Sequence, residues 1–324
     1  MKMRAVRRFL LVTAMGIVSG QAASGTVYTA AEVIGYTPGA GVSPSLTDPS
    51  AALSLPSQST GPGAADGNFS PFNPHYRAGE IVQIGQGGQI TLRLERFVHP
   101  LPGTPSLGVW ENVFLVMGSG DLVGSPASVF GADSAMLEAS ADGINFYPVG
   151  VFSFDWFGNY WTDSSGPYAK LPGSIRADFG TPHGRSLLEF SGLSYGGVLS
   201  LLNGKGGGTW IDLSASGLDR VGWVRFSGVS AGLTLEIDAV AINSALAGAP
   251  TAIPQLRIEI SDSETRVIVP NAPAHAIYKL QHSHAPYGGW QDLDAPSTRS
   301  GGDLVFADRT SPRPGQHFYR VVMP

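Results

Sequence analysis

The sequence predicts an all-β protein whose antiparallel sheets pack as a sandwich, and three observations lead to this class. Glycine (43 residues) and proline (24 residues) make up about a fifth of the chain, so turns are frequent. Only 14% of the residues are charged, and Val, Ile, Thr and aromatic residues are plentiful, as is typical of short strands. Helical periodicity is nearly absent and can be argued only for residues 186–202.

Period-two alternation marks the individual strands. In residues 89–95 every second side chain is apolar, as expected where a strand buries one face. The same alternation recurs in three further segments, 233–239, 256–260 and 278–281. Strands with one buried face favour antiparallel sheets that pack face to face.

Residues 1–24 have the organisation of an export signal. The segment begins with four basic residues, which are followed by an apolar run of about ten residues. A cleavage region of small and polar residues comes next, and we expect cleavage after Ala22 or Ser24. The alternative is a membrane anchor, but a spanning helix needs about 20 apolar residues. We therefore expect a secreted or cell-surface protein with no transmembrane anchor in the mature chain.

The mature chain is acidic and contains no cysteine. Without the signal it has 16 basic and 25 acidic residues, a net charge of −9. We expect no nucleic-acid partner, because such binding depends on neutralising phosphates. Disulfides, cysteine-ligated zinc and thiol catalysis are excluded, so stability must come from hydrophobic cores.

Composition also predicts the domain organisation. Residues 25–246 form the expected first sandwich, and the small, proline-punctuated segment 247–254 is the expected linker. Residues 255–324 have their own strand and turn patterns and predict a small second β-sandwich. Residues 37–78, rich in Pro, Ser, Ala and Gly, are expected to form long ordered loops around the start of the first sandwich.

Residues 28–242 resemble a group of exported bacterial proteins found with PEP-CTERM-type cell-surface sorting. The matching segments, in chain order, are 35–41, 48–49 with 52–53, 85–92, 110–114, 140–146, 207–213, 217–218, 221–226 and 237–240. The resemblance implies a jelly-roll-like β-sandwich similar to galactose-binding and carbohydrate-binding modules, and it implies architecture more than activity.

The tail resembles a small C-terminal β-domain of exported bacterial proteins. The residues that carry this resemblance are 278–283, Trp290, 306–308 and 318–321. No Pro-Glu-Pro motif with an apolar helix and a basic tail follows. We therefore expect a released protein, or one held by non-covalent contacts, and no PEP-CTERM anchor.

The aromatic segment 152–163 is the leading ligand-binding candidate. A sugar presents apolar faces and hydroxyl edges, so its site needs flat aromatic rings beside polar acceptors. The expected contacts to a polysaccharide or cell-surface glycan are Trp156, Tyr160, Trp161, Asp155 and Asn159. The alternative is that the aromatic residues form core and the acidic residues cap turns.

A structural calcium ion is expected from the resemblance. Sandwich modules of the resembled kind often hold Ca²⁺ between an early strand and the last strand, and calcium takes six to eight oxygen ligands. The candidate ligands are Glu32, Asp48, Glu236 and Asp238. Glu236 and Asp238 are two residues apart on the last predicted strand and so share a face. The alternative is that both simply face solvent.

One motif suggests an enzyme. Residues 192–196 match the G-x-S-x-G elbow of serine hydrolases around Ser194, and four later histidines could complete a triad: His275, His282, His284 and His317. The elbow needs a parallel α/β sheet, which the neighbouring sequence does not predict. We expect a non-catalytic binding or adhesion protein, with a structural envelope component and a hydrolase as the alternatives.

Overall fold

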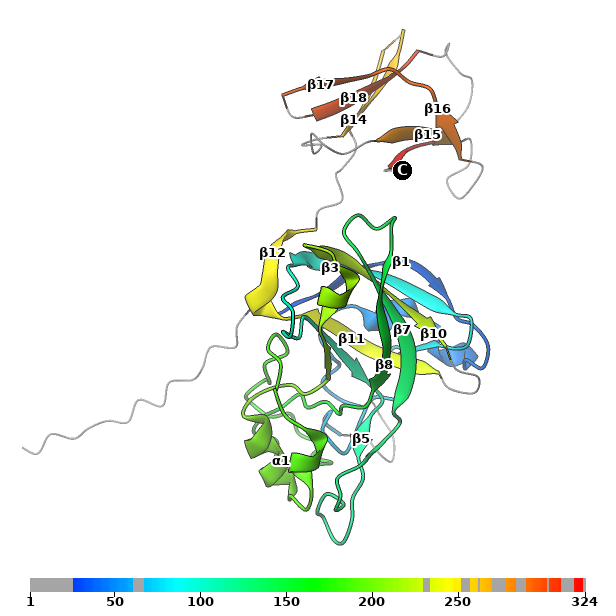
Figure 1. The fold of residues 1–324 in the computed structure, drawn as a ribbon. Helices are drawn as coiled ribbons and strands as arrows, with labels where there is room; N and C mark the ends of the chain where they lie inside the picture. The colour runs from blue at the N-terminus through cyan, green and yellow to red at the C-terminus, as the bar shows by residue number, and fades with distance from the viewer. Residues whose placement is uncertain are drawn as a thin grey trace, which may run out of the picture.

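The computed structural model describes residues 26–60, 67–229, 234–251, 257–261, 263–269, 278–283, 290–301, 303–309 and 318–322. The expected export signal lies outside the described residues, as does the end of the expected linker, residues 252–254. The described chain is all-β, as predicted, with a larger N-terminal and a smaller C-terminal β-structure (Figure 1).

The N-terminal sandwich is a single ten-stranded antiparallel sheet that folds over on itself. One layer consists of β8 (Tyr147–Phe154), β7 (Asp133–Ser140), β10 (Val221–Gly228), β3 (Gln89–Val98) and β1 (Tyr28–Thr37). The other layer consists of β11 (Leu235–Ile242), β4 (Leu107–Glu111), β9 (Thr209–Ile211) and β2 (Val82–Ile84).

Strand β1 belongs to both layers. Its first residues pair with β11, where Tyr28 lies opposite Ile242, and the remainder pairs with β3. The sheet therefore turns through β1 and encloses one hydrophobic core. Ile90, Leu92 and Leu94 are fully buried in this core, which confirms the alternation read from residues 89–95.

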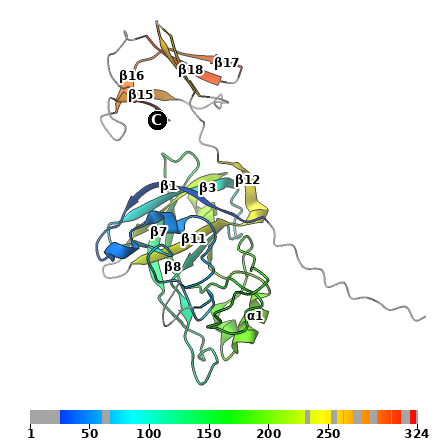
Figure 2. The same cartoon turned by 180° about the vertical axis from the view of Figure 1, so that it is seen from behind.

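Short elements fill the connections. Strands β5 (Phe114–Leu115) and β6 (Val129–Phe130) form a separate hairpin. The helical elements are η1 (Pro44–Leu46), η2 (Pro49–Ala52), η3 (Leu187–Phe190), α1 (Tyr195–Leu202), η4 (Leu213–Ser216) and η5 (Ser244–Leu246). The segment with argued helical periodicity thus forms η3 and α1. Both views place α1 at the end of the sandwich away from β12 (Figures 1 and 2).

The loops before β2 are packed against the sandwich in their described parts. Ala52 is fully buried, and η2 lies against β11. Phe69 and Phe72 are 1% and 4% exposed, and His75 is fully buried. The Pro- and Ser-rich composition of this region therefore reflects ordered loops, as expected, and these loops supply core side chains.

The first sandwich extends further than the sequence suggested. Residues expected to begin the linker form β12 (Ala247–Pro250), which pairs with the end of β3. Thr251 is fully buried and its N–H donates to the carbonyl of Glu95 over 3.1 Å. Small residues fit here because the chain runs close to β3: a Cβ on Gly248 would come within 2.4 Å of the His99 ring.

The C-terminal strands form a second small sandwich, as predicted. One sheet has the order β13 (Arg257–Ile260), β14 (Thr265–Val269), β18 (Asp303–Asp308), β17 (Ser297–Ser300). The other has the order β16 (Gln291–Leu293), β15 (Lys279–Ser283), β19 (Phe318–Val322). Both sheets contribute to one core, which contains Val267, Phe306 and Leu280.

Candidate functional site

The aromatic segment leaves β8 and packs against Trp110 of β4. The Trp110 ring is fully buried, and its Nε1–H donates to the carbonyl of Gly206 over 2.9 Å. Gly158 must lack a side chain here, because a Cβ would meet the Phe69 ring at 2.2 Å and the Trp110 ring at 2.9 Å. Chain segments far apart in sequence therefore hold residues 155–161 in place.

Two of the expected sugar contacts are buried. Tyr160 is 5% exposed, and its ring packs against Trp161 and Phe179 with centroid separations of 4.8 and 5.5 Å. Asn159 is 1% exposed, and its Nδ2 donates to the carbonyl of Trp161 over 3.1 Å. In this structure both residues belong to the core, which is the alternative that the sequence left open.

The other expected contacts are partly exposed. Trp156 lies against His183 with a centroid separation of 3.8 Å and is flanked by Phe190 at 5.7 Å. Trp161 is also partly exposed. The Asp155 carboxyl is half-buried, and this burial raises its pKa. Of the five residues, a ligand in solution can therefore reach Trp156, Trp161 and Asp155.

Trp161 opens a closed loop that ends at Arg176, here named the 161–176 loop. Trp161 and Arg176 form an antiparallel bridge, and the N–H of Thr162 donates to the carbonyl of Ile175 over 2.9 Å. The Asp163 carboxylate accepts hydrogen bonds from the N–H groups of Ser174 and Ile175 at 2.8 and 3.0 Å. The base of the loop is thus fixed by its own polar groups.

Hydrogen bonds from residues about a hundred positions earlier in the chain fix the tip of the 161–176 loop. Asn68 Nδ2 donates to the carbonyl of Leu171 over 2.7 Å, and Ser70 Oγ donates to the carbonyl of Pro167 over 2.6 Å. The tip nevertheless presents apolar side chains, because Tyr168 is 51% and Leu171 is 81% exposed. Exposed apolar side chains on an ordered loop make this tip a candidate contact surface.

The 161–176 loop was not predicted from the sequence as a ligand-binding element. Tyr168 follows the aromatic segment closely, which is a signal that could have included it. The hydrogen bonds from Asn68 and Ser70, by contrast, leave no local pattern in the sequence. Only the folded chain shows that this loop is fixed while its tip is exposed.

His183 is neutral in the folded protein. Its Nδ1 accepts from the N–H of Arg185 over 3.0 Å, so its Nε2 carries the proton that faces the carbonyl of Gly208 at 3.2 Å. Burial lowers the pKa of His183 to about 4. The unfolded chain therefore takes up a proton at this residue at a higher pH than the folded chain.

This pKa predicts acid destabilisation. The stabilising effect of neutral His183 is present above pH 6.5 and is lost as the pH falls toward 4, by about 2–3 kcal/mol. Replacing His183 by phenylalanine keeps a ring against Trp156 and removes the titrating group. Urea unfolding at pH 7 and at pH 4 measures how much free energy of unfolding each variant loses on acidification. This loss should be smaller by that amount in His183→Phe than in the control His99→Phe, which replaces an exposed histidine. If both variants lose the same free energy of unfolding on acidification, the lowered pKa of His183 is contradicted.

Two expected calcium ligands lie in separate local contacts. Glu32 Oε2 receives a hydrogen bond from Arg93 Nε over 2.9 Å. Asp48 caps η2, where Oδ1 accepts from the N–H and the hydroxyl of Ser50 at 2.9 and 2.7 Å. Neither carboxylate is left without a partner.

The other two expected ligands are likewise separately bound. Glu236 accepts from Gln83 Nε2 at 2.6 Å and from Asn112 Nδ2 at 2.8 Å. Asp238 is buried and its Oδ2 lies 2.8 Å from His75 Nδ1. Within the described ranges, no three or more His, Asp or Glu side chains are grouped so that they could hold a metal ion. The four expected ligands therefore do not form one calcium site here.

Ser194 lacks the surroundings of a hydrolase elbow. It is the N-cap of α1, its Oγ accepts from the N–H of Gly197 over 3.3 Å, and its backbone is extended (φ −71°, ψ 167°). The preceding residues form the 3₁₀ helix η3, and the surrounding sheet is antiparallel. Of the four histidines, His282 lies in β15 of the C-terminal sandwich, and the other three lie outside the described residues.

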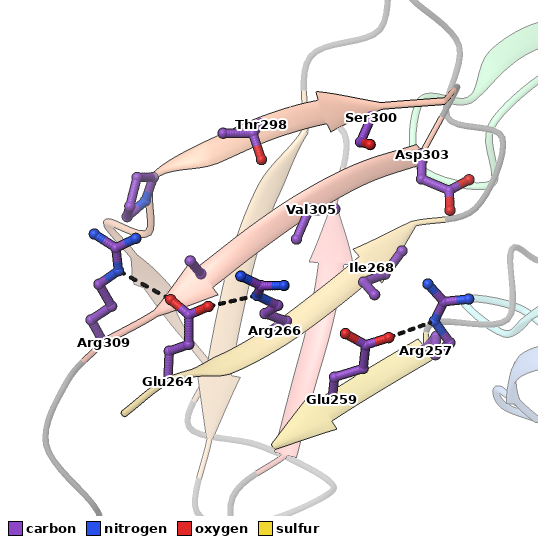
Figure 3. A pocket seen from close by; sticks show the side chains of 12 residues that line it. Arg257, Glu259, Glu264, Arg266, Ile268, Thr298, Ser300, Asp303, Val305 and Arg309 are labelled. Carbon is purple, nitrogen blue, oxygen red and sulfur yellow. Dashed lines mark hydrogen bonds and ion pairs between the residues drawn. The ribbon is translucent and has the colours of Figure 1, made fainter. Parts of the chain in front are cut away.

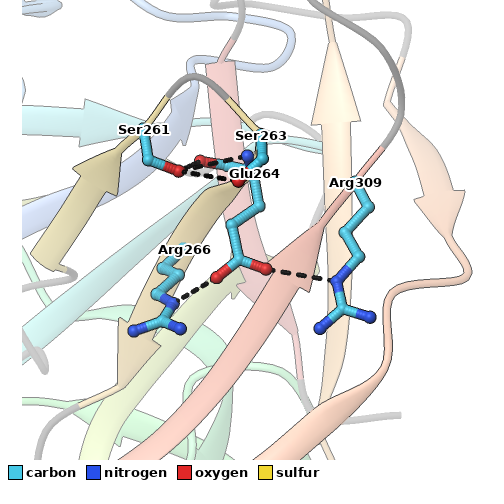
Figure 4. Close-up of polar contacts among 5 residues, drawn as sticks. All are labelled: Ser261, Ser263, Glu264, Arg266 and Arg309. Atoms are coloured by element: carbon cyan, nitrogen blue, oxygen red, sulfur yellow. Dashed lines mark hydrogen bonds and ion pairs between the residues drawn. The ribbon is translucent and has the colours of Figure 1, made fainter.

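The C-terminal sandwich carries a polar groove of about 440 Å³ on the face of the β13–β14–β18–β17 sheet (Figure 3). Its charged side chains satisfy one another. Glu264 receives hydrogen bonds from Arg266 at 2.5 Å and Arg309 at 3.1 Å (Figure 4). These two hydrogen bonds lower the pKa of Glu264. Exposed ion pairs of this kind contribute little stability. Because Glu264 is paired with both arginines, these three residues offer a ligand no unpaired charge.

The comparisons with known proteins add no assignment. No protein-family model matches the chain, and neither a curated protein nor a solved structure matches it. Among the described residues no helix has the length and apolar character needed to cross a membrane. What the protein binds must therefore be inferred from its own residues.

Proposed function

We propose that the protein is an exported, non-catalytic protein that binds a polysaccharide or a cell-surface glycan through the 161–176 loop. The observation that supports this most directly is the Tyr168 ring, which is 51% exposed on a loop held by hydrogen bonds at its base and at its tip. A ring that is ordered before binding loses little conformational entropy when a sugar stacks on it.

The neighbouring residues fit the same role. Trp161 is partly exposed and lies directly against the loop, since a Cβ on Gly173 would come within 2.8 Å of the Trp161 Cβ. The loop also contains hydrogen-bond acceptors, its backbone carbonyls and the Asp163 carboxylate that fixes its base, and sugar hydroxyls require such acceptors. Trp156 lies earlier in the same segment and offers a further partly exposed ring.

The proposal is tested with a glycan array probed by the full mature chain, in calcium and again in EDTA. We expect selective retention on a small set of glycans in at least one condition. Silence in both conditions, with circular dichroism and cooperative unfolding showing a folded protein, would reject glycan binding. A structural role in the cell envelope would then be the better hypothesis, and it predicts self-association.

A further inference from the structure

Exposed apolar side chains gather on the 161–176 loop. Of the fifteen large apolar side chains that are exposed in the described structure, three lie within eight consecutive residues of this loop: Tyr168, Leu171 and Ile175, which are 51%, 81% and 47% exposed. Single exposed apolar residues are common on protein surfaces, whereas a group of them on one ordered segment indicates a contact with a ligand. The loop therefore presents more apolar surface than a single stacking ring.

The backbone that carries Tyr168 and Leu171 is fixed before a ligand arrives. Three alternate carbonyls of the tip accept hydrogen bonds from one short buried segment, residues 68–70. These bonds run from Ser70 Oγ to Pro167 (2.6 Å), from the Asn68 N–H to Ala169 (2.8 Å) and from Asn68 Nδ2 to Leu171 (2.7 Å). Tyr168 and Leu171 are three residues apart, so their Cα atoms are separated by at most about 11 Å. A short oligosaccharide is long enough to contact both.

Tyr168 and Leu171 offer a sugar two different contacts. The flat Tyr168 ring suits the apolar face of a sugar ring. The Leu171 side chain has no polar atom, so it gains from a ligand only when apolar surface is removed from water. Hydroxyl groups on the edge of an unsubstituted sugar would lose water against Leu171 without gaining a hydrogen bond. A sugar with a methyl group beside its ring suits both side chains.

The charges of the loop favour an uncharged substituent. Lys170 is exposed and lies between Tyr168 and Leu171 in the chain. Asp163 is the only acidic residue of residues 161–176, and its carboxylate binds backbone N–H groups at the base of the loop. A free amino sugar is cationic and is disfavoured beside Lys170. Acetylation of the amine removes that charge and supplies the methyl group.

We propose that the sugar recognised by the 161–176 loop carries an N-acetyl group, and that Leu171 selects it. The sugar ring stacks on Tyr168, and the acetamido methyl group packs against Leu171. This selectivity rests on the glycan binding proposed above and narrows it to one class of sugar. Recognition of one extra methyl or methylene group by an apolar contact changes affinity by about tenfold or more.

The test compares glycans that differ only in the acetamido group, with the full mature chain. Oligomers of N-acetylglucosamine are paired with glucose oligomers of the same linkage and length, and N-acetylgalactosamine glycans with their galactose counterparts. We expect the N-acetylated member to bind about tenfold or more tightly than its partner, and to lose this advantage after de-N-acetylation.

The outcomes separate this selectivity from glycan binding as such. Equal affinities within the pairs, or retention confined to glycans without an N-acetyl group, would overturn the selectivity and leave glycan binding intact. An advantage that survives de-N-acetylation would also overturn it. Silence of every glycan on the array would overturn both proposals.

Variants of Leu171 test the assigned residue. The side chain is 81% exposed and Asn68 binds its backbone carbonyl, so Leu171→Ser should fold. The preference for the N-acetylated member should fall about fivefold or more in Leu171→Ser and should be kept in Leu171→Met. Leu188→Ser replaces a leucine that is 65% exposed on η3, outside the loop, and should leave the preference unchanged. An unchanged preference in Leu171→Ser would overturn the role of Leu171.

Discussion

Replacement of Asp238 by alanine is expected to lower the free energy of unfolding by about 3–5 kcal/mol, the usual cost of removing one partner from a buried ion pair. Asp238 is 1% exposed and lies 2.8 Å from His75, which is fully buried. Burial alone would lower the pKa of His75, but Asp238, together with Glu80 and the backbone of Ser57, outweighs that effect and raises it. Urea unfolding at pH 7 measures the loss.

Two controls identify the pair as the cause. Removing both partners in His75→Leu/Asp238→Leu should cost less than Asp238→Ala, because no buried group is then left without its partner. Glu138→Ala breaks the half-exposed pair with Arg225 and should cost about 1 kcal/mol or less. A loss from Asp238→Ala no larger than that from Glu138→Ala would contradict this account of the pair.

The second large effect is expected at Trp110. Replacement by alanine should lower the free energy of unfolding by about 3–5 kcal/mol, because it opens a cavity beneath the aromatic segment. The ring also contacts Phe179 and Trp210 edge-on at 5.3 and 5.9 Å, and its hydrogen bond to the carbonyl of Gly206 is lost. Unfolding in guanidinium, followed by tryptophan fluorescence and circular dichroism, measures the effect.

Trp223 provides a matched tryptophan for comparison. It is partly exposed on β10 and packs edge-on against Phe97, so Trp223→Ala should cost clearly less than Trp110→Ala. If the two substitutions destabilise the protein equally, Trp110 does not have the central packing role assigned to it here.

Local sequence patterns predicted much of the fold, because alternation depends on neighbouring residues. The strand over residues 89–95 could be predicted for this reason. The pairing of β12 with β3 could not, since small residues and proline suit a linker as well as an edge strand. Residues 247–250 therefore form an edge strand, although their sequence suits a linker equally well.

The site was harder to predict because its properties depend on distant contacts. Tyr160 and Trp161 are adjacent in sequence, yet Tyr160 is buried against Phe179 while Trp161 lies partly exposed at the base of the loop. No local pattern around either residue carries that information.

The central claim, glycan recognition by the 161–176 loop, is tested most directly by comparing two exposed tyrosines. Tyr168 is 51% exposed on the loop and Tyr147 is 46% exposed at the start of β8. The measurement is the dissociation constant for the best glycan on the array. We predict that Tyr168→Ala weakens binding about tenfold or more, about 1.4 kcal/mol, and that Tyr147→Ala leaves it unchanged. Equal affinities for the unaltered chain and Tyr168→Ala would contradict the claim.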